Sequence, residues 1–357
     1  MGIGSSLVEI IGPALESIEP IIPGDYFPHF FTMELFQRSL IAAFLITIVA
    51  SALGSFLLIR NLALIGDGLA HVSFGGIAVA IVLGATAPLW YALVFSMVAA
   101  ILIHEMQNRD VLTGDASIAI FLTGMLAFGL VVLRICGGGI TTDVEGYLFG
   151  NLLLIDDASL DLIVYITIFS LTTMYFIHSA LLATAIDPLA AQVQGIPVRG
   201  IGLLFSMITA AVVVSMVQLV GALLVTALLV TPAATAQLIA NNFKYCQIWT
   251  QIFGLSSVIL GLFYSAELGT GTGSMIALVA FFIFALALPS SIFYLFVVSL
   301  SVVSRIVSRE NEGLASTLDP VGAIRWRVPS SDTTSFFADS LGVTSYGCFG
   351  SAGVSAH

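Results

Sequence analysis

Two side chains able to bind a metal ion lie near the start of an otherwise apolar stretch. In IGDGLAHVSFGGIAVAIVLG, residues 65–84, Asp67 and His71 are four residues apart, so a helix places them on one face. An ionised carboxylate in hydrocarbon costs about 2.5–3.5 kcal/mol even on lenient scales, and Asp is too short to reach the membrane surface. Carboxylate oxygen and imidazole nitrogen suit zinc and manganese. The pair therefore predicts a metal pathway, although a bond between the two side chains or to the backbone would also explain it.

Two protein ligands alone make a poor metal site. Two copies of the helix across a dimer axis would supply two Asp and two His, enough for a four-coordinate ion. Glycines around the pair allow close helix approach or local unwinding beside a pathway, and packing without any function explains them almost as well. These glycines are Gly66, Gly68, Gly75 and Gly76.

The composition places these residues in a membrane. Hydrophobic residues make up 59% of the chain and charged residues 9%, and the mean hydropathy is +1.09, whereas soluble domains average roughly 25% charged residues. A span needs roughly 20 mainly apolar residues. We therefore expect an all-α polytopic membrane protein with about nine spans, or eight if one of the sixth and seventh is re-entrant. The expected spans are 36–59, 62–84, 88–104, 115–135, 159–183, 199–217, 219–240, 247–265 and 273–303.

The basic residues near the span ends predict the orientation in the plasma membrane. With the N-terminus outside, Arg60, Arg109, Arg199, Lys244, Arg305 and Arg309 fall inside, and only Arg38 and Arg134 fall outside, as the positive-inside rule requires. We expect an extracytoplasmic segment over 1–33, a transmembrane domain over 34–305 and a cytoplasmic, disordered tail over 306–357, which is rich in Ser, Gly and Thr. A net charge of −11 gives no reason to expect a nucleic-acid partner.

Several motifs of enzymes are missing from the sequence. The single lysine, Lys244, does not follow a Gly-rich turn, so there is no P-loop. His104 and Glu105 are not followed by a second His one turn later, and no GxSxG occurs. The three cysteines are too scattered for a disulfide framework or a zinc finger. The sequence thus predicts a transport protein that does not itself hydrolyse ATP by the P-loop route.

The stretch Gly66–Gly76 resembles a motif of the permease subunit of zinc/manganese ABC importers, G-D-A-L-S-H-A-x-x-P-G. Asp67 and His71 match it, while Gly68, Ala70 and Gly75 replace its Ala, Ser and Pro. The resemblance extends over roughly residues 35–300. It is carried further by LGSFLLIRNLALIGD (53–67), DASIAIFLTGMLAFGLVVL (115–133), YLFGNLL (147–153), IDPLAAQVQGIPV (186–198) and VGALLVTALLVTPAATAQLI (220–239).

The resemblance implies a transport machine with a type II ABC importer architecture. Two permease copies would sit on two ATPase subunits, and an extracytoplasmic binding protein would deliver zinc or manganese. The chain itself would be neither an enzyme nor the holder of a permanent cofactor. A cobalamin or siderophore permease is a weaker alternative, because its wide pathway needs no Asp–His pair. An ion-coupled secondary metal carrier that works without an ATPase is another.

Two further places have expected roles. A short helix starting at Asp187, with Pro188 in its first turn, fits helix capping. The resemblance makes this loop, with Gln192, Gly195 and Pro197, the segment that docks on an ATPase; the alternative is an ordinary interhelical loop. Pro232 lies inside the seventh expected span and removes one backbone hydrogen bond. It is expected to mark either a hinge or a static kink.

Overall fold

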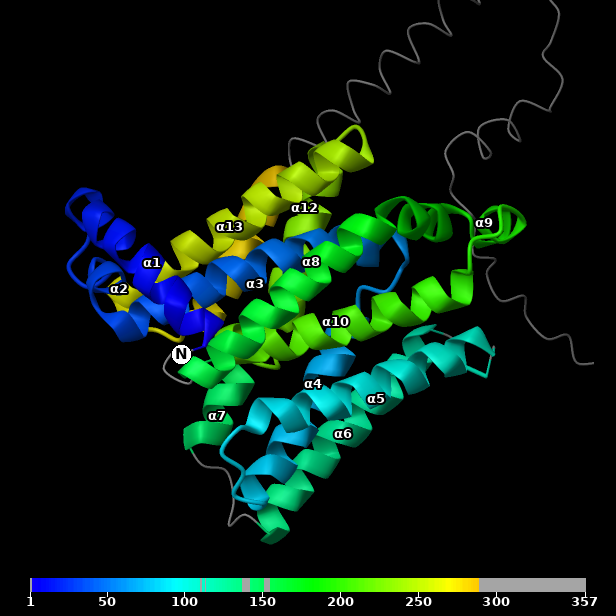
Figure 1. Ribbon diagram of the computed structural model, residues 1–357, viewed down its shortest axis with the longest axis horizontal. Helices are drawn as coiled ribbons and strands as arrows, with labels where there is room; N and C mark the ends of the chain where they lie inside the picture. The colour runs from blue at the N-terminus through cyan, green and yellow to red at the C-terminus, as the bar shows by residue number, and fades with distance from the viewer. Residues whose placement is uncertain (1, 110, 113, 137–141, 151–154, 289–357) are drawn as a thin grey trace, which may run out of the picture. The chain divides into compact units, whose positions relative to one another are not determined.

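The structure is a computed structural model that describes residues 2–109, 111–112, 114–136, 142–150 and 155–288. In these residues the regular structure is entirely helical (Figure 1). Seven helices are long and apolar enough to cross a membrane, and each coincides with an expected span, which confirms the all-α polytopic fold. They are α3 (Glu34–Ile59), α4 (Ile65–Val82), α5 (Pro88–Asn108), α6 (Gly114–Cys136), α8 (Asp157–Ile186), α10 (Val198–Val220) and α13 (Phe243–Leu268).

The expected span 219–240 is divided, which corrects the expectation of one continuous helix. Helix α10 ends at Val220, and Gly221 follows with φ 86°, a left-handed conformation that Gly adopts without steric cost. Two short helices come next, α11 (Val225–Leu229) and α12 (Thr231–Ile239). Pro232 lies in the first turn of α12, where its missing N–H is not needed. It therefore starts a helix instead of interrupting one.

The described residues cover the ninth expected span only in part. A shorter apolar helix runs over Thr272–Leu288. The remainder of the expected span, and the predicted tail over 306–357, lie outside the described residues.

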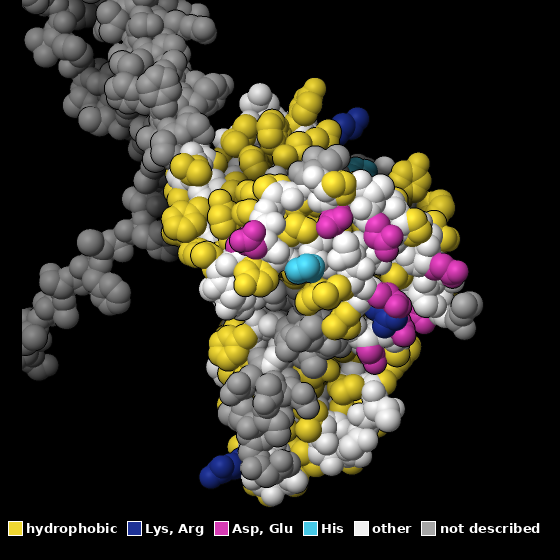
Figure 2. Space-filling view, turned by 90° about the vertical axis from the view of Figure 1, so that its left-hand side faces the viewer, with side chains coloured by type: hydrophobic (Ala, Val, Ile, Leu, Met, Phe, Trp, Pro, Cys, Tyr) yellow, Lys and Arg dark blue, Asp and Glu magenta, His cyan; other side chains and the backbone are white. Residues whose placement is uncertain are grey.

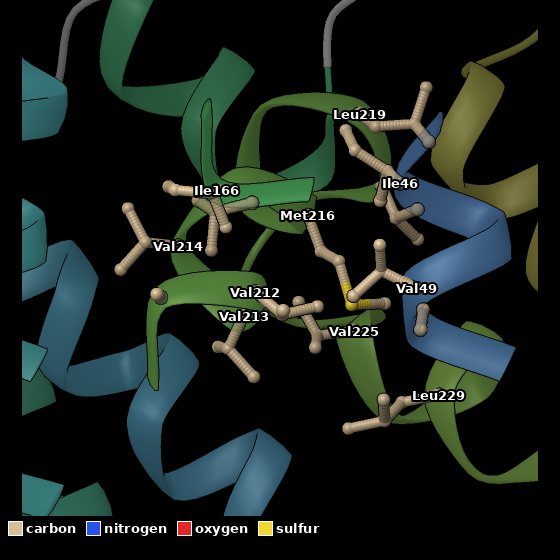
Figure 3. Close-up of a cluster of buried hydrophobic side chains, with 14 of the residues drawn as sticks. Ile46, Val49, Ile166, Val212, Val213, Val214, Met216, Leu219, Val225 and Leu229 are labelled. Carbon is tan, nitrogen blue, oxygen red and sulfur yellow. The ribbon is translucent and has the colours of Figure 1, made fainter. Parts of the chain in front are cut away.

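The core is formed mainly by α3, α4 and α10. In the most apolar 18-residue segment of each helix, 83% of the residues are buried in α3, 78% in α4 and 83% in α10, whereas only 22% are buried in α6. Figure 3 shows side chains of α3, α8, α10 and α11 interdigitating around Met216, which is fully buried. Helix α4 packs mainly on α5 and α6, and also on α10 and α11. The helix that carries Asp67 and His71 is thus among the most enclosed in the described bundle.

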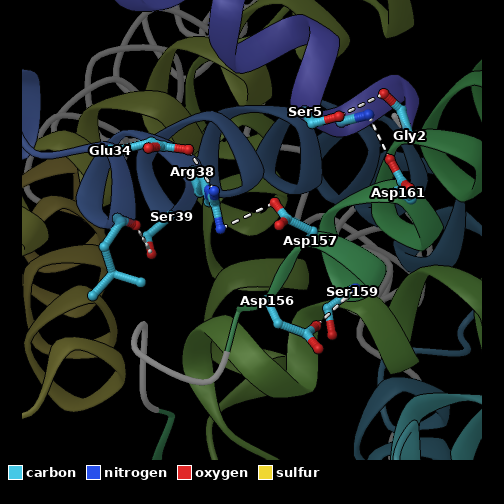
Figure 4. A network of polar contacts seen from close by, with 11 residues as sticks. Gly2, Ser5, Glu34, Arg38, Ser39, Asp156, Asp157, Ser159 and Asp161 are labelled. Carbon is cyan, nitrogen blue, oxygen red and sulfur yellow. Dashed lines mark hydrogen bonds and ion pairs between the residues drawn. The ribbon is translucent and has the colours of Figure 1, made fainter.

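The two ends of the bundle differ. Helices α1 (Ile3–Ile18), α2 (His29–Thr32) and α7 (Thr142–Phe149), with the 3₁₀ helix η1 (Glu19–Ile21), lie at one end, and α9 (Pro188–Val193) lies at the other (Figure 1). Acidic side chains gather at the α1–α2 end (Figure 2). Polar contacts join its elements (Figure 4): the Gly4 N–H donates to Asp161 (2.6 Å), and Arg38 pairs with Glu34 (2.5 Å) and Asp157 (3.0 Å). Residues 2–33 therefore pack as part of the folded unit.

Candidate metal pathway

Asp67 and His71 lie one turn apart on α4, as the spacing predicts, but they are not bonded to each other. Nε2 of His71 is 3.9 Å from Oδ1 of Asp67, beyond hydrogen-bond distance. The His71 side chain is 6% exposed and that of Asp67 is 28% exposed. Nδ1 of His71 is buried and has no hydrogen-bond partner among the described residues, a situation that costs about 1–3 kcal/mol. The pair thus retains capacity to bind a group that the described chain does not supply.

The separation of the two side chains is close to what one ion requires. A tetrahedral zinc ion with bonds of about 2.0–2.1 Å holds its ligand atoms about 3.4 Å apart. A small side-chain rotation would bring Oδ1 of Asp67 and Nε2 of His71 from 3.9 Å to that distance. Among the described residues no group of three or more His, Cys, Asp or Glu side chains could hold a metal. Within the described part of the chain, any further ligand would have to be a group of another kind.

The glycines around the pair lie at close helix–helix contacts. A Cβ built at Gly76 would lie 2.8 Å from the carbonyl oxygen of Tyr91 on α5. A Cβ at Gly66 would lie 2.6 Å from Leu229 of α11. At Gly68 it would lie 2.6 Å from Ile118 of α6, and at Gly75 it would lie 2.9 Å from Met125 of the same helix. Helix α4 runs unbroken through all four positions. The glycines therefore allow close helix approach in this structure and not local unwinding of the helix. His71 is enclosed by helices of its own chain, and Asp67 is the member of the pair that reaches a surface.

The loop expected to contact an ATPase contains the short helix that the sequence predicts. The Asp187 carboxylate accepts hydrogen bonds from the N–H groups of Leu189 (2.9 Å) and Ala190 (3.0 Å), with Pro188 in the first turn of α9. Gly195 (φ 80°) follows α9, Pro197 precedes α10, and Gln192 is exposed. Leu189 and Val193 are 74% and 90% exposed, so α9 presents apolar side chains that a partner could cover.

Sequence reasoning missed a polar contact next to this loop. Nη2 of Arg60, at the end of α3, donates to Oγ1 of Thr184 (2.9 Å), and its guanidinium carbon lies 4.9 Å from the ring centroid of Phe205. Burial lowers the pKa of Arg60. The only signal in the sequence was a lone arginine ending an apolar span, which was interpreted as an orientation marker; its partner Thr184 is 124 residues away.

A second contact lies on the other side of α9. Arg199, near the start of α10, donates to both carboxylate oxygens of Glu105 on α5 (2.6 Å each). Both helices that flank α9 are therefore tied to neighbouring elements.

Known proteins resemble most of the chain. The family model described as "ABC 3 transport family" matches residues 32–291. The manganese import system permease protein ScaB of Streptococcus gordonii is 32% identical over 248 residues, 70% of this chain and 88% of that protein. The high-affinity zinc uptake system membrane protein ZnuB of Haemophilus influenzae is 29% identical over 255 residues, 71% of this chain and 97% of that protein. The solved structure of PsaBC from Streptococcus pneumoniae in complex with Fab has a TM-score of 0.64 and 32% identity, covering 71% of this chain and 91% of that chain.

Proposed function

The chain belongs to the ABC 3 transport family, and on this premise we propose that it is the membrane permease of an ATP-driven importer of zinc or manganese. The observation that carries the proposal is the Asp67–His71 pair on α4. Nε2 of His71 and Oδ1 of Asp67 lie 3.9 Å apart without a hydrogen bond between them, and Nδ1 of His71 has no hydrogen-bond partner among the described residues. The identity to manganese and zinc permeases supports the same class of cargo.

The machine we propose has three other components. Separate ATPase subunits bind the cytoplasmic α9 loop and hydrolyse ATP, and the exposed Leu189 and Val193 support such docking. An extracytoplasmic binding protein delivers the ion at the end that carries α1 and α2, where acidic side chains gather (Figure 2). A second permease copy supplies further ligands, because two side chains from one copy are too few.

Transport follows from the division of the site between two permease copies. His71 binds metal only as a neutral imidazole, and Asp67 only as a carboxylate. With two ligands per copy the ion is held weakly enough to leave again when the helices shift. The junction of α11 and α12, which Pro232 follows, provides the hinge for that shift, since Leu229 at the end of α11 packs on Gly66 beside Asp67. Affinity order favours zinc over manganese at such ligands, so the binding protein and metal availability decide the cargo.

The test is metal uptake into vesicles that contain the permease and its ATPase subunit, with and without ATP. ATP-dependent entry of zinc or manganese is expected. Asp67→Ala should lower the initial rate more than about tenfold, the equivalent of 1.4 kcal/mol, without dissociating the permease from the ATPase. The control is Asp115→Ala, in the exposed first turn of α6, which should transport like the parent. Uptake that needs no ATPase would identify a secondary carrier, and normal uptake by Asp67→Ala would refute the ligand role.

A further inference from the structure

A short turn leads from Arg60 to α4; it is hydrogen-bonded to the end of α3, and the Ile65 N–H of α4 donates to its Leu62 carbonyl (3.1 Å). The Arg60 N–H bonds to the Phe56 carbonyl (3.1 Å), and the Leu62 N–H bonds to the Leu57 carbonyl (2.9 Å). Asn61 between them is left-handed, with φ 55°. Helix α4 begins at Ile65 and carries Asp67 in its first turn. A displacement of the Arg60 side chain is therefore transmitted over a few residues to the helix that bears the candidate metal ligands.

The same guanidinium contacts both helices that α9 connects. Thr184, which accepts its hydrogen bond, is 3% exposed and lies three residues before the Asp187 cap of α9. Phe205, whose ring it faces at 4.9 Å, is 1% exposed and belongs to α10. A charge-assisted hydrogen bond and a cation–π contact are both strengthened when water is excluded. Arg60 thus joins three elements: α3, which it ends, α8 and α10.

The contact on the other side of α9 is of a different kind. Arg199 and Glu105 pair across α10 and α5, with side chains 63% and 29% exposed. Exposed ion pairs contribute little and yield easily to solvent. Moreover, Glu105 lies on α5 and not on the helix that carries the metal ligands.

We propose that Arg60 is the positioning residue that transmits the movement of α9 to α4, and so to Asp67 and His71. The inference rests on the proposed function, because it takes α9 as the docking helix of the ATPase. When the ATPase displaces α9, Thr184 and Phe205 move with the helices that flank it, and Arg60 carries the first turn of α4 along.

The experiment uses the full-length permease reconstituted with its ATPase subunit and measures two quantities. The first is the number of zinc or manganese ions imported per ATP hydrolysed. The second, which needs no metal, is the change in hydrogen exchange of the amides of residues 65–68 when ATP is added. Arg60→Ala should lower the ions per ATP about fivefold while ATP hydrolysis continues, and should abolish the exchange response. Arg60→Lys can still donate to Thr184 and face Phe205, and should restore most of both.

Two further variants complete the design. Thr184→Val removes only the hydrogen bond from Arg60 and should also lower the number of ions imported per ATP. The double variant Arg60→Ala, Thr184→Val should show no further loss than Arg60→Ala alone. Thr184→Val also carries the test if Arg60→Ala does not fold. Arg109→Ala, in an exposed pair with Glu105, is the control and should behave like the parent.

The inference would be overturned if Arg60→Ala imported as many ions per ATP as the parent and showed the same exchange response. If Arg60→Ala does not fold, the same result in Thr184→Val would overturn it. So would an equal fall of uptake and hydrolysis with an intact exchange response. A parent that imports neither metal with ATP would refute the proposed function instead, and the exchange measurement would still decide the role of Arg60.

Discussion

Gly76 lies at a close contact between α4 and α5. A Cβ at this position would be 2.8 Å from the carbonyl oxygen of Tyr91 and 2.9 Å from Cα of Ala92. Both are backbone atoms, so neither can rotate away as a side chain could. We expect Gly76→Ala to force α4 and α5 apart and to destabilise the permease by about 1–3 kcal/mol, as overpacking does. The measurement is the melting temperature of the purified protein in detergent.

The matched control is Gly124→Ala on α6. A Cβ at Gly124 would meet nothing within 4 Å, so its melting temperature should equal or slightly exceed that of the parent. Equal melting temperatures for Gly76→Ala and the parent would show that the α4–α5 contact can widen without cost.

At the scale of single residues, local spacing could be predicted and tertiary partners could not. The four-residue spacing of Asp67 and His71 fixed their common face, since helix geometry alone decides it. Their 3.9 Å separation depends on rotamers, and the enclosure of His71 depends on helices distant in sequence. Arg60 was missed for the same reason, because its partner Thr184 belongs to another helix. The direct functional roles of these side chains remain predictions for the uptake experiments.

Among the elements, α9 gives the sharpest prediction. Val193 is 90% exposed at the end of this helix, so Val193→Asp should leave the permease folded. In a contact with an ATPase the new carboxylate would be buried without a partner, which costs several kcal/mol in an apolar surrounding. We therefore expect affinity for the ATPase subunit to fall at least about tenfold, measured by titrating that subunit against the permease in lipid nanodiscs.

The control for α9 is the same substitution at Val111. This residue is 61% exposed and follows α5, whose C-terminal end contacts the start of α10 through Glu105 and Arg199. It is thus at the same end of the bundle but outside α9. An equal loss of affinity in Val111→Asp would point to a general effect of added negative charge, and unchanged affinity in Val193→Asp would refute docking at α9.

The spans themselves were largely predictable, and the segment 219–240 shows where hydropathy fails. Seven helices coincide with expected spans because length and apolar composition suffice to identify them. Hydropathy does not register backbone conformation, so the division of 219–240 into α11 and α12 was overlooked. Gly221 and Pro232 were the available signals, since Gly permits the left-handed φ after α10 and Pro favours a helix start.

For the whole molecule, the arrangement of the helices could not be derived from the sequence. The enclosure of α4 by other helices of its own chain arises from long-range contacts that no local pattern encodes. Residues 1–33 were expected only as a segment outside the membrane, and the family match begins at residue 32. In the structure α1 packs on α3 and α8, and α2 packs on α3, so this segment is part of the folded unit.

Glu267 at the end of α13 is the main polar anchor of the loop before α2. Its carboxylate accepts hydrogen bonds from the N–H groups of Asp25 (3.2 Å), Tyr26 (3.0 Å) and Phe27 (3.0 Å). The Phe27 ring also packs edge-on against Phe263, with centroids 5.4 Å apart. Hydrogen bonds to an ionised acceptor are stronger than those to a neutral one, and their loss favours local opening.

We therefore expect Glu267→Ala to release this loop while the bundle stays folded. Limited proteolysis in detergent should cleave within residues 19–28 at least about tenfold faster than in the parent, because cleavage follows the population of the open loop. Glu16→Ala, at an exposed position of α1, should be cleaved like the parent. If Glu267→Ala is also cleaved like the parent, the packing of Phe27 on Phe263 suffices to hold the loop. The loop would then depend on apolar contacts and not on the carboxylate of α13.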